Sequence, residues 1–252
     1  MKRNSMEHMR SKIGSQKIIL SDVDSTNNFA AKLVNDGSIG HGSVIMAENQ
    51  SNGRGQQGSL WQSDPHLNLL FSLVLSSKEL QKVNPICINW YVSISIIDFL
   101  KRKNLNAQIK WPNDILIDRK KVSGILIENK FVGSALKHSI IGVGINVNQS
   151  EFNELNATSM KLHTSLDYTI VDLLDDFIFC LSENEHLLFS LKHDDLKQKY
   201  LDSLDGLGEL RNFKKDSGPF EAYLSGVDDI GRLILEVDGK QLLFQNKEIQ
   251  FL

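Results

Sequence analysis

The segment that separates the possible fold classes is Gly53-Arg54-Gly55-Gln56-Gln57-Gly58, which continues as Ser59-Leu60-Trp61-Gln62-Ser63-Asp64-Pro65. Its first six residues match the pattern GxGxxG. That pattern marks a dinucleotide-binding fold only when a helix begins at the glycines and holds a pyrophosphate at its N-terminus. Here a polar stretch with Pro65 leads into a strand instead, and Ser59 stands where a phosphate-binding P-loop requires lysine. The segment therefore predicts a glycine-rich loop between strands in a fold other than the Rossmann fold.

Strand and helix patterns alternate on both sides of this loop. Before it, Asp24-Ser25-Thr26-Asn27 supplies preferred helix N-cap residues, and Gly37 suits the position that ends such a helix. After it, apolar residues alternate from Leu67 to Leu75, which predicts a strand with one face in the core. The remaining strand patterns lie at 17–20, 43–47, 107–110, 115–117, 122–128 and 138–143, with a turn at Asp118-Arg119-Lys120. Two helices are predicted as well. One runs from Asn84-Pro85 to Lys101-Arg102-Lys103, and the other runs from Thr169 to about Leu204 with a break at 190–193.

The pattern changes after Gly206-Leu207-Gly208. Four short strand patterns follow, around residues 210–213, 220–227, 233–237 and 242–244. Asp238-Gly239 lies between the last two and is a typical hairpin turn. This all-β tail predicts a small barrel.

Length and composition are those of a folded chain. At about 150 residues per domain, 252 residues predict one large domain with a smaller one attached. The hydrophobic share of 41% and charged share of 23% exclude a disordered or low-complexity chain. A net charge of −3 gives no support to bulk nucleic-acid binding, which usually leaves a strongly basic surface.

Cysteine, histidine and apolar content exclude further classes. Cys87 and Cys180 are too few for a disulfide framework or a cysteine zinc site, so we expect two reduced thiols in helices. The 7 histidines lack ligand spacing such as HxxxH. No stretch approaches the ~20 apolar residues of a membrane span, and Ile18-Ile19-Leu20 is too short for a signal-peptide core, so we expect a cytoplasmic protein.

Several motifs together resemble a known family. In chain order they are Ser25-Thr26-Asn27, Gln50 through Trp61, Lys110-Trp111-Pro112-Asn113-Asp114, Lys121 with Gly124-Ile125-Leu126-Ile127-Glu128, and Gly142-Val143-Gly144-Ile145-Asn146. From about residue 17 to the C-terminus this set resembles the biotin protein ligases, also called biotin–[acetyl-CoA-carboxylase] ligases. The pairing of the Gly-Arg-Gly loop with Lys-Trp-Pro-Asn-Asp is highly specific for that family.

The resemblance implies a fold and a domain organisation. It implies an α+β protein: a mixed-sheet catalytic domain with the class II synthetase-like biotin–lipoate ligase fold, followed by a small C-terminal SH3-like β-barrel. We expect a flexible N-terminal tail at 1–16, the catalytic domain at 17–204 and the barrel at 205–252. Fewer than 25 residues precede Ser25, whereas independent domains begin at about 50 residues, so we expect a short form without an N-terminal DNA-binding domain.

The resemblance also implies an activity. Such enzymes activate biotin with ATP as biotinyl-5′-AMP and transfer it to a lysine of a biotin carboxyl carrier domain. The site must neutralise anionic charge and keep the reactive adenylate from water. The implied catalytic residues are Lys121 and Arg54, whose cations would contact the biotin carboxylate and the α-phosphate. Arg119, Lys120 and Lys121 are consecutive cations in one turn. Of these three, Lys121 is the one that stands three residues before Gly124, as in the family's motif.

The remaining site residues follow by position in the motifs. For biotin the resemblance implies Ser25, Thr26, Asn27, Gln50, Arg54, Gly55, Gln56, Lys121 and Gly124. For ATP it implies Arg54, Gly58, Trp61, Lys110, Asn113, Lys121 and Asn146, with Asp114 as a ligand of Mg²⁺. Other roles stay open: helix capping for Ser25 and Thr26, a solvated amide for Gln50, core packing for Trp111 and capping of a turn for Asp114.

One departure from the family concerns charge in the loop. Many members carry arginine at the second residue after Arg54 and again near Ser59, whereas this chain has Gln56 and Ser59. Two positive charges over the adenylate are therefore missing. We expect the intermediate to be held less tightly than in those members.

Three other readings remain, and so do open points about partners. The alternatives are a lipoate or octanoate–protein ligase, a biotin- or nucleotide-binding module without catalysis, and a transcriptional repressor. The presence of both Arg54 and Lys121 disfavours a binding module without catalysis. We also expect no specific DNA binding and no membrane partner. The sequence leaves open whether the chain forms a homodimer and which carrier it modifies.

Overall fold

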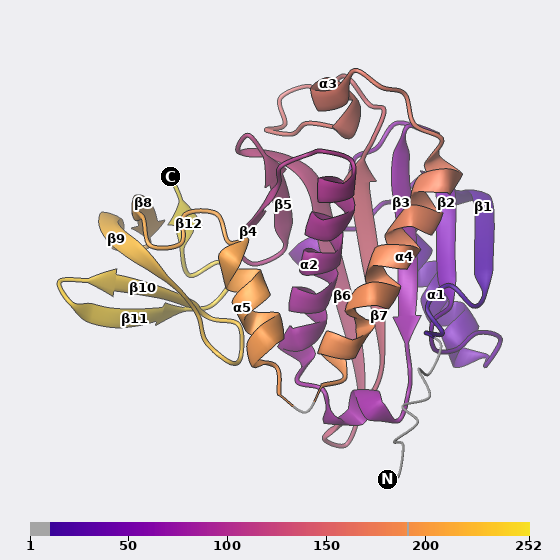
Figure 1. Cartoon of the computed structure of the whole chain (residues 1–252), viewed down its shortest axis with the longest axis horizontal. Helices are drawn as coiled ribbons and strands as arrows, with labels where there is room; N and C mark the ends of the chain where they lie inside the picture. Colours follow the sequence, from indigo (N-terminus) through magenta and orange to yellow (C-terminus); the bar gives the residue numbers. More distant parts are fainter. Residues whose placement is uncertain (1–10, 191) are drawn as a thin grey trace, which may run out of the picture.

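The computed structural model describes residues 11–190 and 192–252, which form two sheets and several helices (Figure 1). The larger sheet is mixed and has 7 strands. Its order is β1 (Lys17–Val23), β2 (Val44–Gln50), β3 (Asn68–Leu75), β7 (Ala135–Asn146), β6 (Lys120–Val132), β5 (Asp114–Ile117) and β4 (Gln108–Lys110). Only β1 and β2 pair in parallel among the named strands of this sheet, so the predicted mixed sheet is confirmed.

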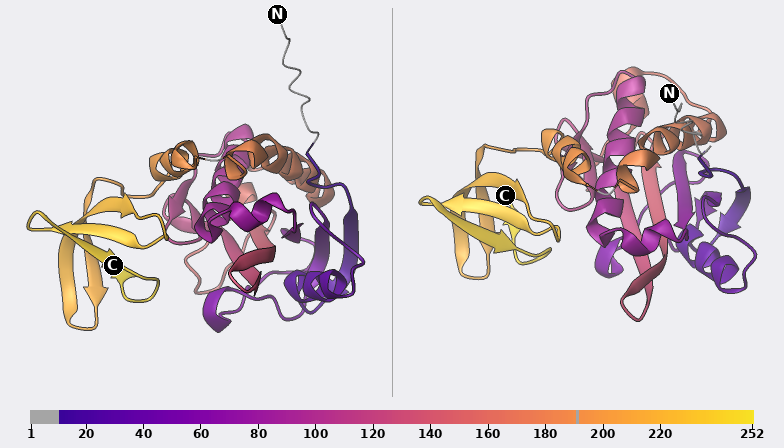
Figure 2. Two further views of the ribbon diagram at one scale, coloured as in Figure 1. Left: turned by 90° about the horizontal axis from the view of Figure 1, so that it is seen from below. Right: turned by 60° about the horizontal axis from the view of Figure 1, so that its bottom comes forward.

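Helices cover both faces of this sheet. The long helices α2 (Pro85–Arg102) and α4 (Ile170–Leu188) lie across one face, beside the shorter α5 (Asp194–Asp202), as Figures 1 and 2 show. Helix α1 (Thr26–Asn35) packs on the opposite face, in a separate apolar cluster with Ile45 and Val74.

Strand β3 corrects one prediction. The alternating pattern predicted a single core face, yet all residues of β3 are buried. Leu73 packs in the main core and Val74 in the cluster beneath α1. The prediction was wrong because β3 lies inside the sheet with helices on both sides, where alternation no longer separates core from solvent.

The helix ends follow the predicted residues. The side chain of Asn84 accepts a hydrogen bond from the backbone N–H of Ile86 and caps α2, with Pro85 as its first residue. Ser25 is the N-cap of α1, and Gly37 follows that helix with φ +77°. The sequence pattern missed the short helix α3 (Met160–Thr164), whose 5 residues are too few for a periodic signal.

The C-terminal part is a separate antiparallel sheet of 5 strands. Its order is β11 (Lys240–Phe244), β10 (Leu233–Val237), β9 (Gly218–Val227), β8 (Leu210–Lys215) and β12 (Gln250–Phe251). Asp238 and Gly239 both have positive φ and form the predicted hairpin turn. Strand β12 was missed because it has 2 residues. Together with the mixed sheet, this second sheet confirms the predicted α+β class, although β11 and β12 are edges that do not pair with each other.

The two sheets touch at the Lys110–Asp114 motif. Trp111 is 6% exposed and belongs to the main core, and its Nε1 donates a hydrogen bond to the carbonyl oxygen of Gly231, 2.9 Å away. This confirms the core-packing role that the sequence left open for Trp111.

The start of the described chain is packed rather than extended. Of the expected tail at 1–16, residues 1–10 lie outside the described residues, whereas Ile13 is 6% exposed in the main core. The thiols of Cys87 and Cys180 are free and buried in α2 and α4, as predicted. No helix within residues 11–190 and 192–252 combines the length and apolar character that a membrane crossing requires.

Candidate active site

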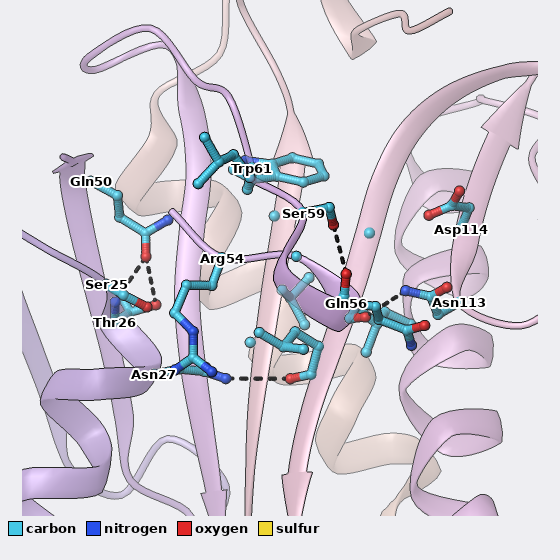
Figure 3. Close-up of a pocket in the computed structure, with 18 of the residues that line it drawn as sticks. Ser25, Thr26, Asn27, Gln50, Arg54, Gln56, Ser59, Trp61, Asn113 and Asp114 are labelled. Carbon is cyan, nitrogen blue, oxygen red and sulfur yellow. Dashed lines mark hydrogen bonds between the residues drawn. The ribbon is translucent and has the colours of Figure 1, made fainter. Parts of the chain in front are cut away.

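A cavity of about 200 Å³ opens where the glycine-rich loop crosses the mixed sheet (Figure 3). It is smaller than the ~300–1,000 Å³ typical of sites for drug-sized ligands. Its lining comes from α1, β2, the loop, β3, β5, β6 and β7: Ser25, Thr26, Asn27, Gln50, Arg54, Gly55, Gln56, Ser59, Leu60, Trp61, Phe71, Asn113, Asp114, Lys121, Gly124, Ile125, Leu126, Gly142, Val143 and Gly144.

Glycines form the floor of this cavity. Gly124 of β6 and Gly144 of β7 are paired across the sheet. A Cβ atom at Gly144 would overlap the indole of Trp61, and one at Gly142 would lie 2.6 Å from Oδ1 of Asn27. These positions lack side chains because two other side chains occupy that space against the sheet.

The loop forms a narrow hairpin over the cavity. The backbone N–H of Trp61 donates to the Gly53 carbonyl oxygen at 3.0 Å, and that of Gly55 donates to Ser59 at 2.7 Å. The only helical turn in the loop is the short 3₁₀ segment Gln56–Gly58, which confirms that no α-helix begins at the glycines. The N–H of Gly55 is therefore used inside the loop.

One end of the cavity is lined by neutral polar groups at the start of α1. Oε1 of Gln50 accepts hydrogen bonds from the backbone N–H of Thr26 at 2.8 Å and from its hydroxyl at 3.1 Å (Figure 3). Gln50 thus caps α1, while the side chain of Ser25 makes no capping bond. The hydrogen bonds of Gln50 to described residues use Oε1, which leaves the amide Nε2 for a ligand.

Arg54 brings a positive charge to the cavity from the loop. Its Nη2 lies 2.6 Å from Oε1 of Glu128, and its Nη1 donates to Oδ1 of Asn28 at 2.6 Å. Asn28 in turn donates to the carboxylate of Asp24 at 2.7 Å, and this bond is the main cause that lowers the pKa of Asp24. The guanidinium is held by acceptors on two different elements.

Lys121 brings the second positive charge, at the opposite end of the cavity. Its Nζ lies 2.6 Å from Oδ1 of Asp114 and 5.4 Å from the centre of the Trp61 ring. Asn113, which Figure 3 shows beside Asp114, donates through Nδ2 to the Ile125 carbonyl oxygen at 2.7 Å. The turn at Asp118 and Arg119, both with positive φ, sets the register that places Lys121 on β6.

Most of the residues predicted for the site meet in this cavity, but three do not line it. Lys110 points toward the C-terminal sheet, where its Nζ lies 5.7 Å from the centre of the Phe251 ring. Asn146 is 3% exposed, and its amide donates to the carbonyl oxygens of Lys121 and Thr158. Gly58 lies at the end of the 3₁₀ turn, outside the lining. A structural role thus accounts for the contacts of Asn146.

The sequence interpretation missed the apolar lining. Phe71 of β3, Leu126 of β6 and Val143 of β7 line the cavity, together with the two glycines of β7. Phe71 and Val143 belong to the main core as well, so their sequence pattern did not mark them as cavity residues. The spacing of Gly142 and Gly144 on one face of a strand was the signal that could have identified the floor.

Comparison with known proteins assigns the class of protein. The model of the Biotin/lipoate A/B protein ligase family matches residues 20–146, half of the chain, and the chain belongs to this family. The biotin–[acetyl-CoA-carboxylase] ligase of Paracoccus denitrificans is 24% identical over 242 residues, covering 92% of this chain and 99% of that protein. The bifunctional ligase/repressor BirA of Bacillus subtilis is 27% identical over 239 residues, covering 91% of this chain and 72% of that protein.

A solved structure agrees over nearly the whole chain. The biotin protein ligase from Aquifex aeolicus, in complex with biotin and ATP, superposes with a TM-score of 0.78 at 27% identity, covering 93% of this chain and 97% of that one. These similarities confirm the predicted family resemblance and show that the chain is a ligase by class.

Proposed function

We propose that the chain condenses biotin with ATP to biotinyl-5′-AMP and then transfers the biotinyl group to a lysine of a biotin carboxyl carrier domain. One observation carries the proposal: neutral hydrogen-bonding groups at Ser25 and Gln50, apolar side chains, and the cations of Arg54 and Lys121 line the same cavity. Biotin carries groups that match all three kinds of lining, namely a ureido ring, an aliphatic chain and a carboxylate. The ligand named for the Aquifex aeolicus structure supports this assignment.

The first step is an attack of the biotin carboxylate on the α-phosphorus of ATP. The carboxylate oxygen forms the new P–O bond, and pyrophosphate leaves. Negative charge gathers between the two anions, so Arg54 and Lys121 stabilise the step by charge-assisted hydrogen bonds. Lys121 has three N–H donors, so it can contact a substrate oxygen while it keeps Asp114.

The second step forms the amide. The carrier lysine amine attacks the acyl carbon of the mixed anhydride, AMP leaves, and the amine gives up a proton. Trp61 covers the glycine floor and would shield the anhydride from water. The reaction needs no covalent intermediate on the enzyme.

ATP is expected to bind with Mg²⁺, and the residues of the site fit that ion. Mg²⁺ usually binds through one or two carboxylates together with substrate phosphates. The residues described contain no group of three or more His, Cys, Asp or Glu that could hold a metal by itself. Asp114 lines the cavity and would supply the carboxylate, and the bound ion would neutralise phosphate charge.

Lipoate is the second candidate substrate, because the family includes lipoate ligases. Its dithiolane ring has no hydrogen-bonding groups to match Ser25 and Gln50. A site that leaves polar groups unpaired rejects such an analogue strongly. The test is pyrophosphate release with ATP and either acid: we expect release with biotin, whereas release with lipoate alone would overturn the proposal.

Further proposals concern organisation and partners. We propose a catalytic domain at 17–204 and a small domain at 205–252, and limited proteolysis checks the boundary. We also propose a cytoplasmic enzyme that does not bind DNA specifically, since a net charge of −3 gives no support to nucleic-acid binding. Strand β1 is an edge of the larger sheet, and sedimentation at working concentration tests whether two chains associate through it.

A further inference from the structure

Glu128 lies behind the candidate site and takes part in its charge arrangement. Gly124, Leu126 and Glu128 alternate along β6 and therefore share one face of the strand. The first two line the cavity, and Glu128 lies just beyond its lining. Its carboxylate binds Arg54 through Oε1 at 2.6 Å and Asn27 through Oε2 at 2.8 Å. One carboxylate thus joins the loop to α1.

The bonds to Arg54 leave part of the guanidinium free for a substrate. Those recorded among the described residues involve Nη1 and Nη2, with Glu128 and Asn28 as acceptors. The Nε–H takes part in none of them. A guanidinium has five donors in a fixed plane, so acceptors on one edge orient the other edge. Glu128 therefore sets the direction in which Arg54 presents its remaining donors.

The same carboxylate is linked to the neutral end of the cavity. Asn27 accepts a hydrogen bond from the hydroxyl of Ser72 at 2.6 Å, and that hydroxyl lies 2.8 Å from the Thr26 hydroxyl. Thr26 donates to Gln50. Ser72 is 0% exposed, so its hydroxyl has no access to water in place of these partners. A chain of polar contacts thus runs from Arg54 to Gln50, in which the Ser72 hydroxyl donates to Asn27 and the Thr26 hydroxyl donates to Gln50.

We propose that Glu128 is a positioning residue, which orients Arg54 toward the substrate carboxylate and holds Asn27 in the network beneath the cavity. The inference rests on the proposed function. Glu128 does not touch the reacting atoms, and its effect passes through Arg54. Because the side chains of Arg54 and Glu128 are 39% and 36% exposed, their ion pair adds little to stability. A change in catalysis is therefore separable from a change in folding.

The test is Glu128→Gln, which keeps the shape of the side chain and an acceptor for Asn27 but removes the charge that holds Arg54. We expect kcat/KM for biotin, measured by pyrophosphate release, to fall about tenfold, because a small misplacement of Arg54 lowers the rate of reaction. The melting temperature should stay within about 2 °C of wild type. The control is Asp175→Asn, which removes the exposed ion pair with Lys17 and should leave both values unchanged.

A double-mutant cycle then separates positioning from a general structural role. In an Arg54→Ala background, Glu128→Gln should change kcat/KM less than twofold, because its effect passes through the missing arginine. A full tenfold effect in that background, or none in wild type, would overturn the inference. If wild type itself releases no pyrophosphate with biotin, the proposed function fails instead, so the two failures are distinguishable.

Discussion

At the scale of single residues, the two cations of the cavity are each held by a carboxylate. Lys121 pairs with Asp114 and Arg54 with Glu128, both at 2.6 Å. The free site is thereby close to neutral, and both cations already line the cavity that the proposed substrates would enter. Such preorganised charges cost little reorganisation when the transition state forms.

Lys121 is the residue whose loss should cost most. We predict that Lys121→Ala lowers biotin-dependent pyrophosphate release by roughly 10²–10³-fold, the usual cost of losing one transition-state donor. Lys120→Ala is the matched control, because that exposed lysine is adjacent in sequence but does not line the cavity. Near-wild-type release by the Lys121 variant would remove it from the mechanism.

Gln56 is one of the two loop positions, with Ser59, at which we expected a positive charge to be missing. Its Oε1 accepts a hydrogen bond from Nδ2 of Asn246, beyond β11 in the C-terminal part, at 2.9 Å. We predict that Gln56→Arg slows the dissociation of biotinyl-AMP, because a cation is added beside an anionic ligand. Asn246→Ala removes the hydrogen bond without adding charge and should not slow dissociation. Equal rates for wild type and Gln56→Arg would refute the prediction.

At the scale of elements, strands β6 and β7 build the floor on which the other parts lie. Their paired glycines let the Trp61 indole rest directly on the sheet. We predict that Gly144→Ala displaces this indole and lowers activity at least tenfold, with a changed tryptophan fluorescence. Gly40→Ala is the control, since nothing lies within 4 Å of a Cβ there. Full activity in the Gly144 variant would show that Trp61 need not contact the floor.

The elements themselves were largely predictable, but their arrangement was not. Capping by Asn84 and the hairpin at Asp238 were read correctly because they depend on neighbouring residues. The burial of β3 on both faces and the placement of β7 between β3 and β6 depend on contacts far apart in sequence. Short elements such as α3 and β12 carry too few residues to show a period.

In the candidate site, likewise, most of the residues were predictable from the sequence, whereas their arrangement was not. Lys121 and Arg54 were identified by a motif, and they meet in one cavity from separate elements. Lys110 is the cross-strand partner of Asp114, yet its Nζ lies over the Phe251 ring of the C-terminal sheet and not in the cavity. A linear motif indicates which residues lie near a site, whereas strand alternation and packing decide which of them face it.

At the scale of the whole molecule, both thiols report on the intact fold. Cys87 is 2% and Cys180 1% exposed, and burial raises the pKa of each to about 11. The thiolate is the reactive form, so we predict slow alkylation at pH 8 and fast alkylation once the chain unfolds. Because these pKa values are raised on folding, their contribution to stability is complete below pH ~9 and declines as the pH rises toward 11. Rapid labelling of the native protein would contradict this burial.

For the molecule as a whole, we propose that the cavity and its loop join biotin to a lysine of a carrier domain. The most direct test is to incubate the purified chain with biotin, Mg-ATP and a biotin carboxyl carrier domain, and to measure the mass of the carrier. We predict one biotinyl group on one lysine, formed only with ATP present and abolished by a carrier Lys→Arg substitution. A carrier that stays unmodified with biotin but gains a lipoyl group when lipoate is supplied would contradict the claim.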